Sequence, residues 1–327
     1  MSETVGRRRG ERQMPGAVGP DPAIPRRKLR SELRSVREAA GMTQKDVAGT
    51  MDWSQSKLIR IESGAVNIST NDLRALLNHY NVDSARIEPL VDLARAARET
   101  TRWSIYKDVA TTELLAFLGY ESSASIIRNS EPFYVPGLLQ TEEYARTVLS
   151  NIEARNPLRI DPLVDLRMER QELLVRQPPV DLHFIMDEAV IRRVIGGHDV
   201  MRRQLRHLRR LIEEDSNITA RIVPFDHGLY PRQQVSYWLF EFPNPEDEYV
   251  LYVENFERGE HIIRESSAEE EDQDSPVHYL ETFYGLEQIV SREVTLDLLQ
   301  DAIKRLTKEP PRLAAVAEAG EADPQQG

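Results

Sequence analysis

Three helix-capping signals divide the stretch 43–77 into short helices, and this division limits the folds that the chain can adopt. Thr43, Ser54 and Ser69 each stand where a helix would begin, and an aspartate follows the first and the third of them three positions later. Such hydroxyls accept a hydrogen bond from an otherwise unpaired N–H of the first helical turn. Gly64 is placed to end the second of these helices. The sequence therefore predicts helices of about eight residues that pack as a bundle.

Apolar spacing adds one helix on each side of this stretch. Apolar residues recur every three or four positions from Arg26 to Ala40, and again from Ser84 to Ala97. Such spacing places them along one side of a helix, where they can be buried together. We therefore predict an all-α domain of five helices over residues 26–97.

The second of the three capped helices should pack against the first in a specific way. Leu58 and Ile61 are three positions apart and should point inward, toward Ala48 of the preceding helix. A small residue at that point lets the two helices cross closely. Two short helices joined by a tight turn, here at 52–53, are what a helix-turn-helix motif requires.

The opposite face of the same helix suits contact with DNA bases. Gln55 can bond N6 and N7 of adenine, Arg60 can bond O6 and N7 of guanine, and Ile59 can meet a thymine methyl group. The alternative is a solvated polar face with one stray apolar residue. The lysines at 45 and 57 are candidates for phosphate contacts. The predicted DNA-contacting set is Gln44, Lys45, Ser54, Gln55, Ser56, Lys57, Ile59 and Arg60.

The stretch from Leu33 to Leu77 resembles the XRE family, the helix-turn-helix domains that are similar to phage repressors. The turn departs from the commoner family pattern, because Asp52 and Trp53 stand where glycine is frequent. Aspartate tolerates the left-handed conformation that such a turn needs. The matching positions are Leu33, Arg37, Gly41, Thr43, Gln44, Val47, Ala48, Ser54, Gln55, Ser56, Arg60, Ile61, Glu62 and Gly64.

The resemblance implies roles for four side chains. Arg37 would form an ion pair with Glu62 and so tie the first helix to the third. Gln44 would grip a phosphate at the start of its helix while it holds Gln55 against a base. From the class of DNA-binding domain we also expect a homodimer, whose two reading helices enter successive major grooves of a pseudo-palindromic operator.

Beyond Arg98 the pattern predicts a larger mixed α+β domain, over residues 98–307. Strand-like and helical runs alternate there, which favours a mixed or antiparallel sheet. We expect a disordered basic arm at 1–25, a loop at 265–275 and a disordered tail at 308–327. The strand-like runs are 124–130, 180–186, 218–223, 235–242 and 249–253. The helical runs are 103–117, 144–149, 163–175, 199–214 and 277–306, the last with a break near its middle.

The second domain carries a resemblance of its own. The segment 126–141, with its Val135-Pro136-Gly137 turn, resembles an uncharacterised domain that follows such helix-turn-helices in many actinomycete regulators. The segments 186–193, 222–225 and 240–243 agree with the same pattern. The resemblance implies a small companion protein and an antitoxin-like role for some members. It leaves open what the domain senses.

The net charge of −12 is divided unevenly along the chain. Residues 1–85 hold 14 lysines and arginines against 10 aspartates and glutamates, which leaves 28 against 44 for the remainder. Only the N-terminal quarter can therefore approach a polyanion without repulsion. The acidic remainder either binds a partner or serves as a solvated surface.

The absence of some residue patterns excludes several classes of protein. The chain has no cysteine, which rules out disulfides and thiolate metal sites. No stretch approaches the roughly 18 apolar residues of a membrane helix, so we expect a cytoplasmic protein.

The seven histidines lack metal-binding spacing, and no phosphate loop or dinucleotide fingerprint occurs. We therefore expect no enzyme, no catalytic residue, no metal and no cofactor. Three roles remain open for the second domain: binding a partner protein, binding a small molecule, or masking a toxin. Its acidity slightly favours the partner protein.

Overall fold

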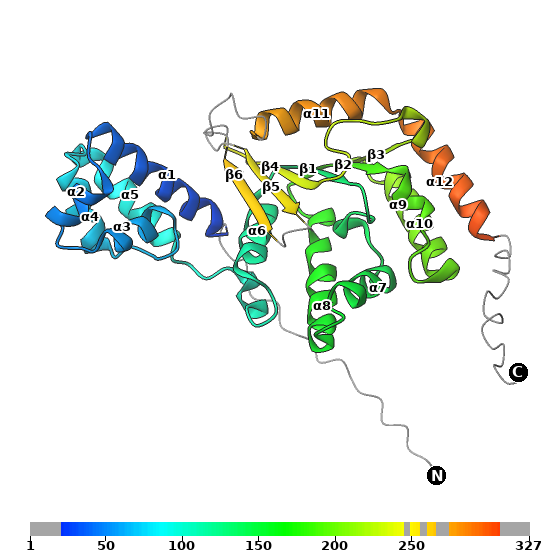
Figure 1. The fold of residues 1–327 in the computed structure, drawn as a ribbon, viewed down its shortest axis with the longest axis horizontal. Helices are drawn as coiled ribbons and strands as arrows, with labels where there is room; N and C mark the ends of the chain where they lie inside the picture. The colour runs from blue at the N-terminus through cyan, green and yellow to red at the C-terminus, as the bar shows by residue number, and fades with distance from the viewer. Residues whose placement is uncertain (1–20, 245–248, 256–259, 266–274, 308–327) are drawn as a thin grey trace, which may run out of the picture. The chain divides into compact units, whose positions relative to one another are not determined.

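The computed structural model describes residues 21–244, 249–255, 260–265 and 275–307 (Figure 1). The chain divides into two compact units, Met1–Ser123 and Ala124–Gly327. Most of the predicted arm, the predicted 308–327 tail and most of the predicted 265–275 loop lie outside the described residues. An all-α region followed by a larger mixed α/β region confirms the predicted fold class.

Unit 1 contains the five predicted helices, which are α1 (Ala23–Ala39), α2 (Gln44–Thr50), α3 (Gln55–Glu62), α4 (Thr70–His79) and α5 (Ser84–Ala96). Their apolar faces meet in one core that includes Leu33, Leu58, Leu73 and Val91. The first helix begins three residues before the predicted position 26. Pro25 has no backbone N–H group, but the N–H groups of the first helical turn have no carbonyl partner within the helix, so a proline is tolerated there.

Unit 1 extends past the predicted boundary at 97, to Ser123. The added elements are the 3-10 helix η1 (Arg102–Tyr106) and α6 (Thr112–Ser123). The Thr101 hydroxyl donates to Asp21 over 2.5 Å, and Arg26 Nε donates to the Ala97 carbonyl over 2.7 Å. Trp103 is fully buried. These contacts fold the segment that follows α5 back onto the start of α1.

Unit 2 is built on a six-stranded mixed sheet in the order β3-β2-β1-β4-β5-β6. The first three strands in this order are parallel, and β4, β5 and β6 continue the sheet antiparallel. The strands are β1 (Ile126–Glu131), β2 (Asp181–Asp187), β3 (Ile218–Val223), β4 (Ser236–Glu241), β5 (Val250–Asn255) and β6 (Glu260–Glu265). The sequence predicted the first five of these, but β6 has only two apolar residues and was missed.

Helices cover the sheet on both faces (Figure 1). On one face, α11 (Pro276–Ile289) packs Phe283 and Leu286 against Leu239 and Leu251. On the other side lie α7 (Glu142–Ile152) and α8 (Ile160–Arg170). The remaining helices are α9 (Glu188–Arg192), α10 (Gly197–Glu214), α12 (Arg292–Thr307), η2 (Gly137–Leu139), η3 (Pro157–Arg159), η4 (Gln171–Val175) and η5 (Phe225–His227). The break between α11 and α12 lies where the sequence predicted one.

The edge strand β3 is covered by α12. The backbone N–H of Ile222 donates to the hydroxyl of Thr295, which is fully buried, over 3.1 Å. A backbone donor at the edge of the sheet therefore has a side-chain partner in place of a seventh strand.

Two buried glutamines fix the loop that follows β1. Gln140 donates to the Val135 carbonyl over 2.7 Å. Gln204 of α10 donates to the Leu139 carbonyl over 2.8 Å and accepts from the Thr141 N–H over 2.7 Å. Because these bonds satisfy buried backbone groups, they fix the loop that carries the Val135-Pro136-Gly137 motif and tie the segment before α7 to α10.

Glu131 at the end of β1 is a buried carboxyl group. It accepts a hydrogen bond from the Ser236 hydroxyl over 2.8 Å. Burial raises the pKa of Glu131 to about 8, because desolvation disfavours the charged form and outweighs the hydrogen bond.

We predict that Glu131→Gln stabilises the protein at alkaline pH. The folded-state pKa lies above the ordinary value of 4.5. The native state therefore loses stability as the pH rises from that value through about 8, and glutamine, which cannot ionise, avoids the loss. Urea unfolding at about pH 5 and about pH 9 should show a gain of a few kcal/mol that appears only at the higher pH. The exposed Glu214→Gln is the control, and an equal effect of Glu131→Gln at both pH values would contradict the prediction.

Candidate nucleic-acid interface

The helix α2 begins at a capping box, as the sequence predicts. The Thr43 hydroxyl accepts from the Asp46 N–H over 3.2 Å, and the Asp46 carboxylate accepts in return from Thr43. These hydrogen bonds hold the pKa of Asp46 below its ordinary value. Asp52 takes the left-handed conformation with a φ of 54°. The chain then turns sharply, and the Trp53 N–H donates to the Ala48 carbonyl over 2.8 Å.

The helix α3 separates a buried from an exposed face. Ser54 caps it by accepting from the Lys57 N–H over 3.2 Å. Leu58 and Ile61 are buried in the core of unit 1. The predicted reading residues are all exposed, and Ile59 among them is 43% exposed. They are Gln55, Ser56, Ile59 and Arg60. Unit 1 therefore leaves this face of α3 open to contact with a ligand.

A buried ion pair joins α1 to α3. Arg37 Nε donates to one Glu62 oxygen over 2.7 Å, and its Nη2 donates to the other over 3.1 Å. A third nitrogen of the same guanidinium donates to the Met42 carbonyl over 3.0 Å. Both side chains are buried, and the bond to Glu62 raises the pKa of Arg37. The pair implied by the family resemblance is thus present in the structure.

Gln44 lies against Glu62, whereas the resemblance implies a contact with Gln55. Its amide donates to the Glu62 carboxylate over 2.8 Å. The glutamate therefore binds both Arg37 and the start of α2. The Glu62 carboxylate is a charged acceptor within reach of the Gln44 amide, and such charge-assisted hydrogen bonds are stronger than neutral ones, which explains the difference.

Two of the remaining side chains that we predict to contact DNA, Lys57 and Arg60, bind other groups of unit 1 in the structure. Lys57 Nζ lies 3.2 Å from a carboxylate oxygen of Asp72 and 3.8 Å from the centre of the Trp53 ring. Arg60 Nε donates to the Ser56 carbonyl over 3.3 Å. Lys45 is exposed at the start of α2. A phosphate contact by Lys57 would therefore require it to leave Asp72.

Sequence reasoning missed the side chains that position these groups. The sequence indicates Trp53 only as part of the turn and Asp72 only as a capping residue. No sequence pattern indicates Tyr80, yet it is buried near Arg37 and Glu62. Its hydroxyl has no hydrogen-bond partner among the described residues, and burial raises its pKa. The sequence signal that could have pointed to Trp53 is its place directly before Ser54, the residue that caps α3.

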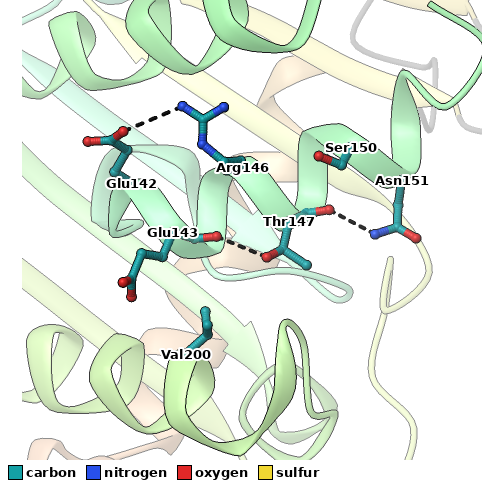
Figure 2. Close-up of a pocket in the computed structure, with 7 residues that line it drawn as sticks. All are labelled: Glu142, Glu143, Arg146, Thr147, Ser150, Asn151 and Val200. Atoms are coloured by element: carbon teal, nitrogen blue, oxygen red, sulfur yellow. Dashed lines mark hydrogen bonds and ion pairs between the residues drawn. The ribbon is translucent and has the colours of Figure 1, made fainter. Parts of the chain in front are cut away.

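Unit 2 offers a different candidate site, a hollow of about 390 Å³ beside α7 and the start of α10 (Figure 2). Its volume suits a small molecule, and most of the surface that lines it is apolar. The polar side chains of the lining bind neighbouring groups: Arg146 approaches Glu142 to 3.5 Å, and Asn151 donates to the Thr147 backbone carbonyl over 2.8 Å. The lining residues are Glu142, Glu143, Arg146, Thr147, Ser150, Asn151 and Val200.

Within the described ranges, no group of three or more histidines and acidic residues is arranged to hold a metal ion. None of the helices that could be searched there has the length and apolar character needed to cross a membrane.

Comparison with known families agrees with the geometry of α2 and α3. Residues 28–90 match a family described as a helix-turn-helix domain. This region is a helix-turn-helix domain. Residues 114–273 match a domain of unknown function, DUF5753, and these two matches together support a helix-turn-helix regulator. No curated protein and no solved structure was found to match the chain.

We predict that Glu62→Ala strongly destabilises the helix-turn-helix domain. It leaves the buried Arg37 guanidinium without its carboxylate, a change that costs about 3–5 kcal/mol for a buried pair. Replacing both partners, as in Arg37→Met with Glu62→Leu, should cost less than the two single changes together. Thermal unfolding followed by circular dichroism measures these effects.

The control is the exposed pair Arg74–Glu88, whose atoms approach to 2.9 Å. Arg74→Ala should leave the melting temperature nearly unchanged, because solvent screens exposed pairs. Equal effects of Arg74→Ala and Glu62→Ala would contradict the assigned role of the buried pair.

Proposed function

We propose that the chain is a sequence-specific DNA-binding transcription regulator rather than an enzyme, and that α3 is its reading helix. The observation that carries this proposal is the two-faced α3. Leu58 and Ile61 anchor it in the core, while Gln55 and Arg60 project from the opposite face. A helix held in this way at a tight turn can enter a major groove with its polar side chains toward the bases.

The exposed side chains fit particular base edges. Arg60 would bond guanine once its contact with the Ser56 carbonyl is exchanged for a base, and Gln55 would bond adenine. Ile59 would meet a thymine methyl group, which accounts for an exposed isoleucine. Gln44 and Lys45 lie in the first turn of α2, where N–H groups and the helix dipole favour a phosphate.

We further propose that the protein binds as a homodimer to a pseudo-palindromic operator, with half-sites about one helical turn apart. The support is the positional agreement of residues 33–77 with the XRE family, and we propose that the chain is a regulator of the actinomycete type. Arg37, Glu62 and Gln44 occupy one cluster, which is the arrangement that such a domain needs to orient α3.

For unit 2 we propose the binding of a companion protein that adjusts regulation. The support is the excess of acidic residues beyond position 85, which suits a partner protein with a basic surface. The alternatives are a small-molecule sensor and an antitoxin that represses its own operon while masking a toxin.

We predict that Arg60→Ala relaxes base preference at one position of the operator. The expected loss is about 1–3 kcal/mol for the preferred base, with discrimination at the other positions retained. Selection of duplexes from a random pool, followed by sequencing, measures the preference. Lys45→Ala is the matched control, because loss of a phosphate contact should weaken all sequences alike and reduce the salt dependence of binding. An unchanged preference for Arg60→Ala would remove this residue from the reading set.

We predict that the full chain forms a stable complex with the product of a neighbouring gene in the absence of any metabolite. Co-purification followed by sedimentation tests this interaction. A rise in melting temperature with a metabolite, and none with the neighbouring proteins, would instead support the small-molecule sensor.

A further inference from the structure

The average charge of the second domain conceals one strongly basic segment. From Arg192 to Arg210 the chain has seven arginines and a single acidic residue, Asp199. Beyond position 85 as a whole, by contrast, 28 basic side chains stand against 44 acidic ones. Five of the seven arginines belong to the helix α10, so the structure of this helix decides where the positive charge lies.

The helix α10 places its apolar and basic side chains on different faces. Leu205 and Leu208 are fully buried, whereas Arg203, Arg206 and Arg210 are exposed. Because these three arginines are three and four positions apart, they form one stripe along the outer face of the helix. This arginine stripe, from 203 to 210, spans about 10 Å of the helix axis.

Acidic side chains neutralise only part of the charge of α10. Three of its five arginines have a carboxylate partner at 2.6 to 2.9 Å, in the pairs Arg202–Asp199, Arg203–Glu143 and Arg209–Glu213. Among the described residues, Arg206 has no such partner, and Arg210 contacts the ring of His207 over 3.1 Å. Burial and the nearby Arg210 lower the pKa of His207, so this ring supplies no compensating charge. Two exposed guanidinium groups of the stripe therefore remain without a carboxylate.

The outer face of α10 offers charge without an apolar anchor. None of the large apolar side chains that are exposed in the described part of unit 2 belongs to α10. The centre of a protein interface is more apolar than its rim, and a few well-packed anchors there carry most of the binding energy. The phosphate backbone of DNA, by contrast, is bound by arginine and lysine without apolar contacts. The stripe therefore fits a phosphate backbone better than the acidic surface of a protein.

We propose that the arginine stripe of α10 is a second DNA-binding surface, which contacts the phosphate backbone of a duplex and does not read its bases. Double-helical DNA carries one negative charge per about 1.7 Å of its axis, so a stripe of about 10 Å faces several phosphates. The role of this surface rests on the proposed function, because DNA held by α3 raises the effective concentration of duplex for unit 2 of the same chain. Its electrostatic basis is independent of α3.

The test is the salt dependence of duplex binding by the full chain. Arg206→Gln combined with Arg210→Gln removes two exposed charges, so the slope of log K against log salt concentration should become shallower by about 2, with base preference unchanged. Arg206→Lys combined with Arg210→Lys keeps the charges and should keep the slope. Arg155→Gln, at an exposed arginine of unit 2 outside α10, is the matched control and should leave the slope unchanged.

Cross-linking tests the contact directly, since the chain has no cysteine of its own. An Arg206→Cys chain that carries a photoactivated cross-linker on its thiol should be joined to the duplex. The Arg155→Cys chain with the same label should not. Equal cross-linking from the two positions, or an unaltered slope in the doubly substituted glutamine variant, would overturn the proposal.

Two further outcomes separate this proposal from others. If the glutamine variant bound DNA as the unaltered chain does but no longer co-purified with an acidic protein, the stripe would be a protein-binding surface and the DNA proposal would be wrong. Gln55→Ala combined with Arg60→Ala should remove base preference while salt-dependent binding through the stripe remains. An unaltered chain without base preference, whose slope still changes at 206 and 210, would count against the proposed function and support the stripe.

Discussion

The buried pair of Arg37 and Glu62 is the interaction on which the geometry of the helix-turn-helix depends. One carboxylate accepts from a guanidinium of α1 and from the Gln44 amide at the start of α2, although it belongs to the last residue of α3. Three helices are therefore oriented around a single side chain. Because an uncompensated charge at this place would be costly, the arrangement favours one relative position of the three helices over its alternatives.

The local elements of unit 1 could be predicted because their determinants are local. Thr43, Ser54 and Ser69 cap their helices in the structure as the sequence indicates. The extension to Ser123 could not be predicted, because it depends on Thr101 bonding to Asp21 and on α6 packing against α1, far away in the sequence. The strand β6 was missed for a similar reason. Its place is set by pairing with β5 rather than by an apolar pattern of its own.

In the candidate site, too, some features follow from the local sequence and others depend on tertiary packing. The exposure of Gln55, Ser56, Ile59 and Arg60 follows from helical periodicity once Leu58 and Ile61 are assigned to the core. The partners of Gln44 and Lys57 do not follow from periodicity. Long polar side chains choose among acceptors that tertiary packing brings near, and Asp72 and Glu62 come from different helices.

The hydroxyl of Thr295 has a consequence for how this protein can assemble. An exposed strand edge is a template on which another chain can add a strand, and proteins commonly protect such edges. Because α12 lies along β3 and binds one of its backbone donors, growth of the sheet by strand addition is obstructed on that side. Aggregation through that edge would first require α12 to detach. The helix α12 thus protects the edge of the sheet and also contributes side chains such as Leu299 to the buried core.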